Sequence, residues 1–150
     1  MTVSGAAQAA LFSCLLLTAS VWDLRKREIP DIISALLFCT GLLSFTPDKL
    51  AGILLGLPLL IAALGKKGGM GGGDIKLTAA AGFVLGLPAG ITGLFLGLSV
   101  AILYHLTICT IRKLNNMKLP AASQTSLPLA PFLSAGFITV YFMNDGGLFL

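Results

Sequence analysis

The feature that most constrains the fold is a series of long apolar runs separated by short polar stretches. An apolar run of about 20 residues is long enough to cross a bilayer as a helix, and a helix satisfies its own backbone hydrogen bonds in lipid. Continuous runs, without strict alternation, argue against a transmembrane barrel. We therefore predict an all-α polytopic membrane protein, a six-transmembrane-helix bundle forming one domain over residues 1–150. The six runs are 6–22, 31–46, 50–65, 74–89, 90–111 and 128–143.

The small number and the clustering of the charged residues also indicate a membrane protein. Only 11% of the residues are charged, against 56% hydrophobic ones. The net charge of +4 does not indicate nucleic-acid binding, because the basic residues form short clusters between the apolar runs, as topology signals do. The predicted surroundings are a lipid bilayer, with no nucleic-acid partner.

The basic residues also predict the orientation. Nine of the ten lie in or beside the odd-numbered loops, and Lys49 is the exception. By the positive-inside rule those loops face the cytoplasm, so both termini are predicted outside. The first run has no basic residues before it, so we interpret it as a retained span of the cell membrane and not as a signal peptide. The nine are Arg25, Lys26, Arg27, Lys66, Lys67, Lys76, Arg112, Lys113 and Lys118.

Small residues recur at helix-packing spacing. Pairs of glycines four residues apart let helix backbones approach closely in lipid, which predicts a compact bundle. The pairs are Gly52 with Gly56, Gly82 with Gly86, and Gly93 with Gly97.

The cysteines do not suggest a metal site. Cys14, Cys39 and Cys109 lie inside apolar runs, far apart in sequence, which is neither a metal-ligand spacing nor a disulfide framework. We interpret them as small buried hydrophobic residues, and we predict no metal and no cofactor.

A glycine-rich stretch leads directly to an acid. Five of the six residues from Gly68 to Gly73 are glycine, and Asp74 follows at the start of the fourth run. A carboxylate at the edge of a membrane span is a candidate functional residue. The stretch lacks the Gly-Lys-Ser/Thr ending of a phosphate-binding loop.

Asp23 ends the first run, so Asp23 and Asp74 are expected at the same membrane surface. Two carboxyl groups close together share one proton, so that one can act as a base and the other as an acid, which is the chemistry of metal-free peptide hydrolysis. Taken singly, Asp74 could instead be a helix N-cap and Asp23 could pair with Arg27. His105 and its neighbour Tyr104 are interpreted as bundle packing, since nothing indicates a catalytic triad.

Three motifs together resemble one family. Asp23 is followed by Ile29-Pro30, Gly71-Gly72-Gly73 precedes Asp74, and the stretch from Leu127 contains Pro128-Leu-Ala-Pro-Phe-Leu. This order is similar to that of the type IV prepilin peptidase family, membrane aspartic proteases with a GxGD motif. The resemblance covers essentially the whole chain.

The resemblance implies a function. Asp23 and Asp74 would be the catalytic pair of a membrane-embedded peptidase domain that removes a short, basic leader from type IV prepilin-like precursors at the cytoplasmic face. The chain resembles the short, peptidase-only members of Flp/Tad-type pilus systems, so no N-methyltransferase activity is expected. The residues assigned to substrate binding or to the loops of the site are Gly71, Gly72, Gly73, Lys76, Ile29 and Pro30.

The roles of Asp31 and Lys76 and the function of the chain each allow an alternative. Asp31 stands where the family often has asparagine and could compete as a partner of Asp23, although we favour a first-turn acid of the second helix. Lys76 would face away from Asp74 on a helix and act as a headgroup anchor or a substrate contact. The alternative to a peptidase is a small transporter or a pilus or secretion assembly subunit, but the discontinuous helices and repeats of transporters are not visible.

Overall fold

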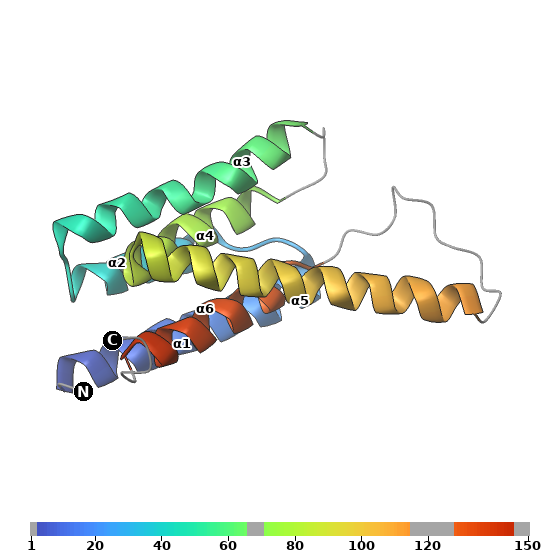
Figure 1. Cartoon of the computed structure of the whole chain (residues 1–150). Helices are drawn as coiled ribbons and strands as arrows, with labels where there is room; N and C mark the ends of the chain where they lie inside the picture. The colour runs from blue at the N-terminus through green and yellow to red at the C-terminus, as the bar shows by residue number, and fades with distance from the viewer. Residues whose placement is uncertain (1–2, 66–70, 115–127, 146–150) are drawn as a thin grey trace.

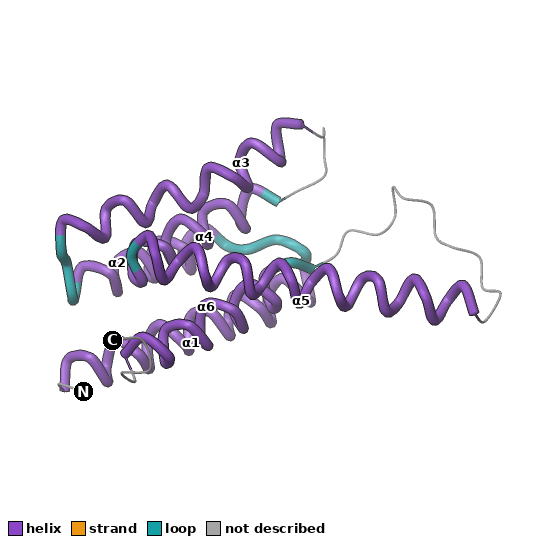
Figure 2. Tube along the Cα trace, viewed as in Figure 1, coloured by secondary structure: helices purple, strands orange, loops and turns teal. Residues whose placement is uncertain are grey.

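The computed structural model describes residues 3–65, 71–114 and 128–145, and these form helices joined by short loops (Figure 2). The predicted all-α bundle of six helices is confirmed. A 3₁₀ segment, η1, continues directly into α3, and Figure 1 shows the two as one continuous helical segment. The elements are α1 (Val3–Lys26), α2 (Asp31–Leu42), η1 (Pro47–Leu55), α3 (Gly56–Gly65), α4 (Gly72–Leu85), α5 (Leu87–Leu114) and α6 (Ala130–Asp145).

The helices differ in length more than the apolar runs suggested. In the described ranges, three segments are long and apolar enough to cross a membrane, namely Gly5–Lys26, Pro47–Gly65 and Leu87–Leu114. α4 has 14 residues and rises only about 21 Å, which is shorter than a hydrocarbon core of about 30 Å. α2, with 12 residues, is shorter still.

The predicted boundary between the fourth and fifth runs, at residues 89 and 90, is wrong. α4 ends at Leu85 because Gly86 has a φ of +82°, a conformation that suits glycine. The Gly86 N–H donates to the Gly82 carbonyl oxygen at 2.8 Å, and α5 begins at Leu87. Gly86 is therefore a turn residue and not the packing residue that its spacing suggested.

α4 lies at the centre of the bundle. It contacts α2, η1, α3, α5 and α6, while α6 also packs between α1 and α5. Most of α4 from Leu77 to Val84 is buried. Because other helices enclose α4, it is shielded from lipid and need not match the bilayer thickness.

Glycines make the closest approaches between helices. Gly52 of η1 meets Gly82 of α4 backbone to backbone, and a Cβ on Gly97 of α5 would lie 2.9 Å from the Cα of Leu133 in α6. Gly93 meets Phe137 of α6 in the same way. The predicted role of these glycines in close packing is confirmed.

The three cysteines, Tyr104 and His105 are more exposed than the sequence suggested. Cys14 and Cys39 are exposed and Cys109 is half-buried, so the interpretation of the cysteines as buried residues is wrong. Tyr104 is half-exposed and its ring lies 5.1 Å from that of Phe132. His105 is exposed, and its Nε2 lies 3.6 Å from the Cys109 Sγ. The outer faces of these helices are apolar, so such side chains project from the bundle towards the expected lipid.

One end of the bundle collects the segments that the sequence singled out. The C-terminal end of α1 and the N-terminal ends of α2, α4 and α6 lie together there, and α5 extends beyond them (Figure 1). This end therefore holds both predicted catalytic acids.

Candidate active site

Asp23 is buried in the last turn of α1. Its exposed fraction is 6%, whereas its neighbours Trp22 and Leu24 are 40% and 60% exposed. The carboxylate oxygen Oδ2 accepts a hydrogen bond from the Ala130 backbone N–H at 3.1 Å. The acid is thus turned into the bundle and held by the start of α6.

The first turn of α6 explains why this N–H is available. The first N–H groups of a helix have no partner within the helix. Pro131 has no N–H to donate, and the N–H groups of Phe132 and Leu133 both donate to the Leu129 carbonyl oxygen at 3.1 Å. The Ala130 N–H instead donates to Asp23. Sequence reasoning missed Ala130, although the proline-rich start of this helix carried the signal.

α1 ends in an unusual conformation beside Asp23. Arg27 has a φ of 55°, which is uncommon for a residue other than glycine. Its N–H donates to the Asp23 carbonyl oxygen at 2.8 Å, the single bond of a left-handed C-terminal cap. The Arg27 side chain also interacts electrostatically with the Asp23 carboxyl group. The predicted attraction between these two residues is present, but Arg27 lies just beyond the helix.

Asp74 is buried in the first turn of α4. Its exposed fraction is 8%, and its N–H donates to the Gly71 carbonyl oxygen at 3.2 Å. Gly71 occupies the N-cap position, so the alternative interpretation of Asp74 as an N-cap is wrong. The Asp74 Oδ1 atom is buried and has no hydrogen-bond partner among the described residues.

The two acids line one small cavity. It has a volume of about 210 Å³ and is lined by Asp23, Arg27, Glu28, Ile29, Gly71, Gly72, Gly73 and Asp74. The Asp23 and Asp74 carboxyl groups interact electrostatically across it. A cavity of this size has room for several waters. Two coupled carboxyl groups can hold one proton between them, activate a water and polarise a carbonyl.

Comparison with known proteins agrees with this geometry. Residues 10–106, which include both acids, match the model of the type IV leader peptidase family. This chain belongs to that family.

One relative is the prepilin leader peptidase/N-methyltransferase of Bacillus subtilis (strain 168), which is 33% identical over 145 residues. The match covers 91% of this chain and 56% of that protein. The chain therefore spans about half the length of this curated relative. No solved structure matches.

The glycines of the leader-peptidase motif are not equivalent. A Cβ on Gly73 would lie 2.8 Å from the Ile29 Cβ and 3.3 Å from the Ile29 backbone, whereas a Cβ on Gly72 would meet nothing within 4 Å. Gly73 therefore lets the first turn of α4 lie directly on the loop between α1 and α2. Ile29 forms the opposing wall, and Pro30 is the N-cap position of α2.

Asp31 and Lys76 pair with each other outside the cavity. Lys76 Nζ donates to both carboxylate oxygens of Asp31 at 2.7 Å, and the two side chains are 56% and 74% exposed. Asp31 is a first-turn acid of α2, as favoured above, and it does not line the cavity with Asp23. A substrate role for Lys76 stays a prediction.

Some residues of the sequence analysis lie outside the described part of the chain. They are Lys66, Lys67, Gly68, Gly69, Lys118 and Leu127.

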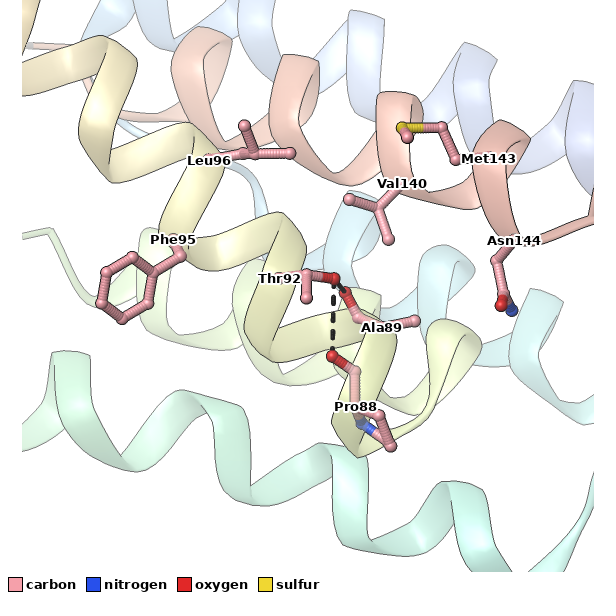
Figure 3. A pocket seen from close by; sticks show the side chains of 8 residues that line it. All are labelled: Pro88, Ala89, Thr92, Phe95, Leu96, Val140, Met143 and Asn144. Atoms are coloured by element: carbon pink, nitrogen blue, oxygen red, sulfur yellow. Dashed lines mark hydrogen bonds between the residues drawn. The ribbon is translucent and has the colours of Figure 1, made fainter. Parts of the chain in front are cut away.

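A larger cavity lies at the opposite end of the bundle (Figure 3). Its volume is about 520 Å³, and its lining from α5 and α6 includes Phe95, Leu96 and Val140. The Thr92 hydroxyl in it donates to the Ala89 carbonyl oxygen at 2.8 Å. No acid or base is present among the described residues that line this cavity.

Proposed function

We propose that this chain is an aspartic endopeptidase that removes the leader from type IV prepilin-like precursors. The observation that supports it most is the meeting of two buried carboxyl groups, from α1 and α4, on one small cavity. Family membership supports the same reaction, and the name of the Bacillus relative supports the substrate class.

The surroundings of the two acids suggest different roles. Asp23 accepts the Ala130 N–H at the N-terminus of α6, where the helix dipole favours negative charge, and Arg27 lies beside it. Asp74 has a buried oxygen with no partner among the described residues, and a neutral carboxyl group is less costly to bury than a carboxylate. In this proposal Asp23 is the base and Asp74 is the acid.

The reaction follows from these roles. Asp23 takes a proton from a water in the cavity while Asp74 donates a hydrogen bond to the scissile carbonyl oxygen. The water oxygen bonds to the carbonyl carbon and forms a tetrahedral intermediate. This intermediate collapses with cleavage of the C–N bond, and the proton held by Asp23 passes to the leaving amine.

The proposal also covers the side of the membrane on which the active site lies and the absence of N-methyltransferase activity. The distribution of Lys and Arg supports an active site facing the cytoplasm of the cell membrane. We also propose leader cleavage without N-methylation of the new terminus. The two acids supply the groups needed for hydrolysis, and the three cysteines form no paired motif in the sequence.

A cleavage assay with purified protein in liposomes tests the peptidase. With a prepilin-like substrate and chelator present, we expect cleavage by the wild type. Asp23→Asn and Asp74→Asn should each lower the rate by on the order of 100- to 10,000-fold, the range of acid–base catalysis. The control is Asp31→Asn, whose exposed ion pair with Lys76 is worth at most about 1 kcal/mol, so its rate should stay close to wild type.

Other results would redirect the proposal. If Asp23→Asn cleaved the substrate and Asp31→Asn did not, the catalytic pair would be Asp31 and Asp74 instead of Asp23 and Asp74. No cleavage by a folded wild type would favour a transporter or an assembly subunit. The mass of the cleaved product reports methylation directly, and a product heavier by one methyl group in the presence of a methyl donor would refute the peptidase-only part.

A further inference from the structure

A groove runs along the outer face of α1, away from the catalytic cavity. Its volume is about 460 Å³, and its described lining lies on α1 between Cys14 and Lys26. Leu17 and Val21 are 58% and 50% exposed in it. The Thr18 hydroxyl donates to the Cys14 carbonyl oxygen at 2.7 Å, so this polar group is satisfied by its own helix. We call this surface the α1 groove, and most of its length is apolar.

The end of the α1 groove is cationic. Arg25 and Lys26 line it in the last turn of α1, and neither forms a salt bridge within the described parts of the chain. Trp22 lies at the border between the apolar and the charged part, with Lys26 Nζ 5.2 Å from its ring centre. Tryptophan favours the level of the lipid headgroups in membrane proteins. An occupant of the groove therefore needs an apolar tail and an anionic head.

The length of the groove fits one leaflet of a bilayer. From Cys14 to Lys26 the helix rises about 18 Å, whereas a whole hydrocarbon core measures about 30 Å and one leaflet about half of that. A single lipid, with its acyl chain beside Leu17 and its headgroup at Arg25, matches this length. A spanning helix of another protein would need a longer surface.

The position of the groove argues against a peptide substrate. With about 3.6 residues per turn, Cys14, Val21 and Arg25 lie on the face of α1 opposite Asp23, while Lys26 lies at the edge of the groove, about 60° from Asp23 around the helix. Asp23 points into the bundle and is 6% exposed. A polypeptide lying in the groove would thus be separated from the catalytic cavity by α1 itself.

We propose that the α1 groove is a binding site for an anionic phospholipid, whose headgroup pairs with Arg25 and Lys26 and whose acyl chain lies along Leu17 and Val21. This site is separate from the catalytic cavity. It does not depend on the proposed peptidase activity.

The chain offers a direct probe of this site. Trp22 is its single tryptophan, and it lines the groove. Bromine atoms on a lipid acyl chain quench the fluorescence of a nearby tryptophan. Full-length protein would be reconstituted with either brominated phosphatidylglycerol in neutral phosphatidylcholine, or brominated phosphatidylcholine in phosphatidylglycerol, at equal mole fractions.

We expect stronger quenching of Trp22 by the brominated phosphatidylglycerol. A charge near the membrane surface contributes roughly fivefold in affinity for anionic lipid, so Arg25→Gln with Lys26→Gln should weaken the preference by about tenfold or more. Raised salt should weaken it as well. The charge-conserving pair Arg25→Lys with Lys26→Arg should keep most of the preference.

The matched control is Arg112→Gln with Lys113→Gln, which removes the same number of charges from the last turn of α5. This control should keep the preference of the wild type. Equal quenching by the two brominated lipids would overturn the proposal. So would a preference that survives in the Arg25 and Lys26 glutamine variant, or one that is lost in the α5 control. The readout needs no cleavage, so the peptidase proposal stands or fails separately.

Discussion

At the scale of single residues, the two proposed catalytic acids differ in the groups that hold them. Asp23 has a backbone donor, and Arg27 interacts with it electrostatically, whereas Asp74 has a buried oxygen without a partner among the described residues. Leaving a buried polar group unpaired costs about 1–3 kcal/mol. Such a cost is reasonable at a site where a bound water or substrate carbonyl supplies the missing hydrogen bond.

The contact between Gly73 and Ile29 gives a test at this scale. In Gly73→Ala the new Cβ would lie 2.8 Å from the Ile29 Cβ, so α4 and the loop before α2 must move apart. We expect a loss of about 1–3 kcal/mol in the free energy of unfolding. Misplacing a catalytic group by about 1 Å can lower a rate by about 100-fold. Thermal unfolding in detergent and the leader-cleavage assay measure the two effects.

Gly72→Ala is the control for stability. Its Cβ would meet nothing within 4 Å, and alanine favours helix over glycine by about 1 kcal/mol. We expect an unfolding temperature equal to or above that of the wild type. A Gly73→Ala protein as stable as Gly72→Ala would contradict the close contact with Ile29.

At the scale of elements, the start of α6 contributes a backbone donor to the candidate active site. Within the described part of the chain, the backbone donor of the Asp23 carboxylate is Ala130, at the end of the helix where the dipole is positive. Behind it, the Ser20 hydroxyl donates to the Ser134 hydroxyl oxygen at 2.9 Å and links α1 to α6 again. The two helices thus orient Asp23 as one unit.

Ala130→Pro tests this role. Proline fits the first position of a helix and removes the backbone N–H, while its ring adds bulk at this position. A hydrogen bond to a charged group contributes about 1.5–3 kcal/mol, so we expect cleavage to fall by on the order of 10- to 100-fold. Ala130 is fully buried, and the control Ala130→Val therefore adds similar bulk while keeping the N–H. Equal rates for the two variants would show that steric crowding, and not the lost donor, is responsible.

At the scale of the whole molecule, the helix ends place Asp31 and Asp48 at opposite ends of the bundle. The start of α2, at Asp31, lies at the end that holds Asp23 and Asp74, while Asp48 lies at the start of η1, after α2 has crossed the bundle (Figure 1). In the orientation that we propose from the positive-inside rule, the first end faces the cytoplasm.

Thiol labelling in intact cells tests this orientation. In a chain whose three cysteines are replaced by alanine, Asp48→Cys should react with a membrane-impermeant maleimide added outside. Asp31→Cys, 74% exposed in the wild type, should react only after the cells are permeabilised. The reverse pattern would contradict the proposed orientation and place the acids on the outer side.

The amino-acid sequence was enough to predict the helical class, the membrane setting, the family motifs and the two candidate acids. These properties depend on the length of apolar runs and on residues close together in the chain, so they can be seen without a structure. The run 74–89 did not reveal that α4 ends at Leu85, because the turn at Gly86 depends on a backbone φ of +82° that apolar patterning does not encode.

The tertiary structure alone decided which groups meet. It paired Asp31 with Lys76, set Gly73 against Ile29 and made Gly86 a turn. It also brought Ala130 to Asp23 across 107 residues of chain. Such contacts depend on how helices pack side by side, and hydrophobic patterning marks which face of a helix is buried without naming the atoms that it will touch.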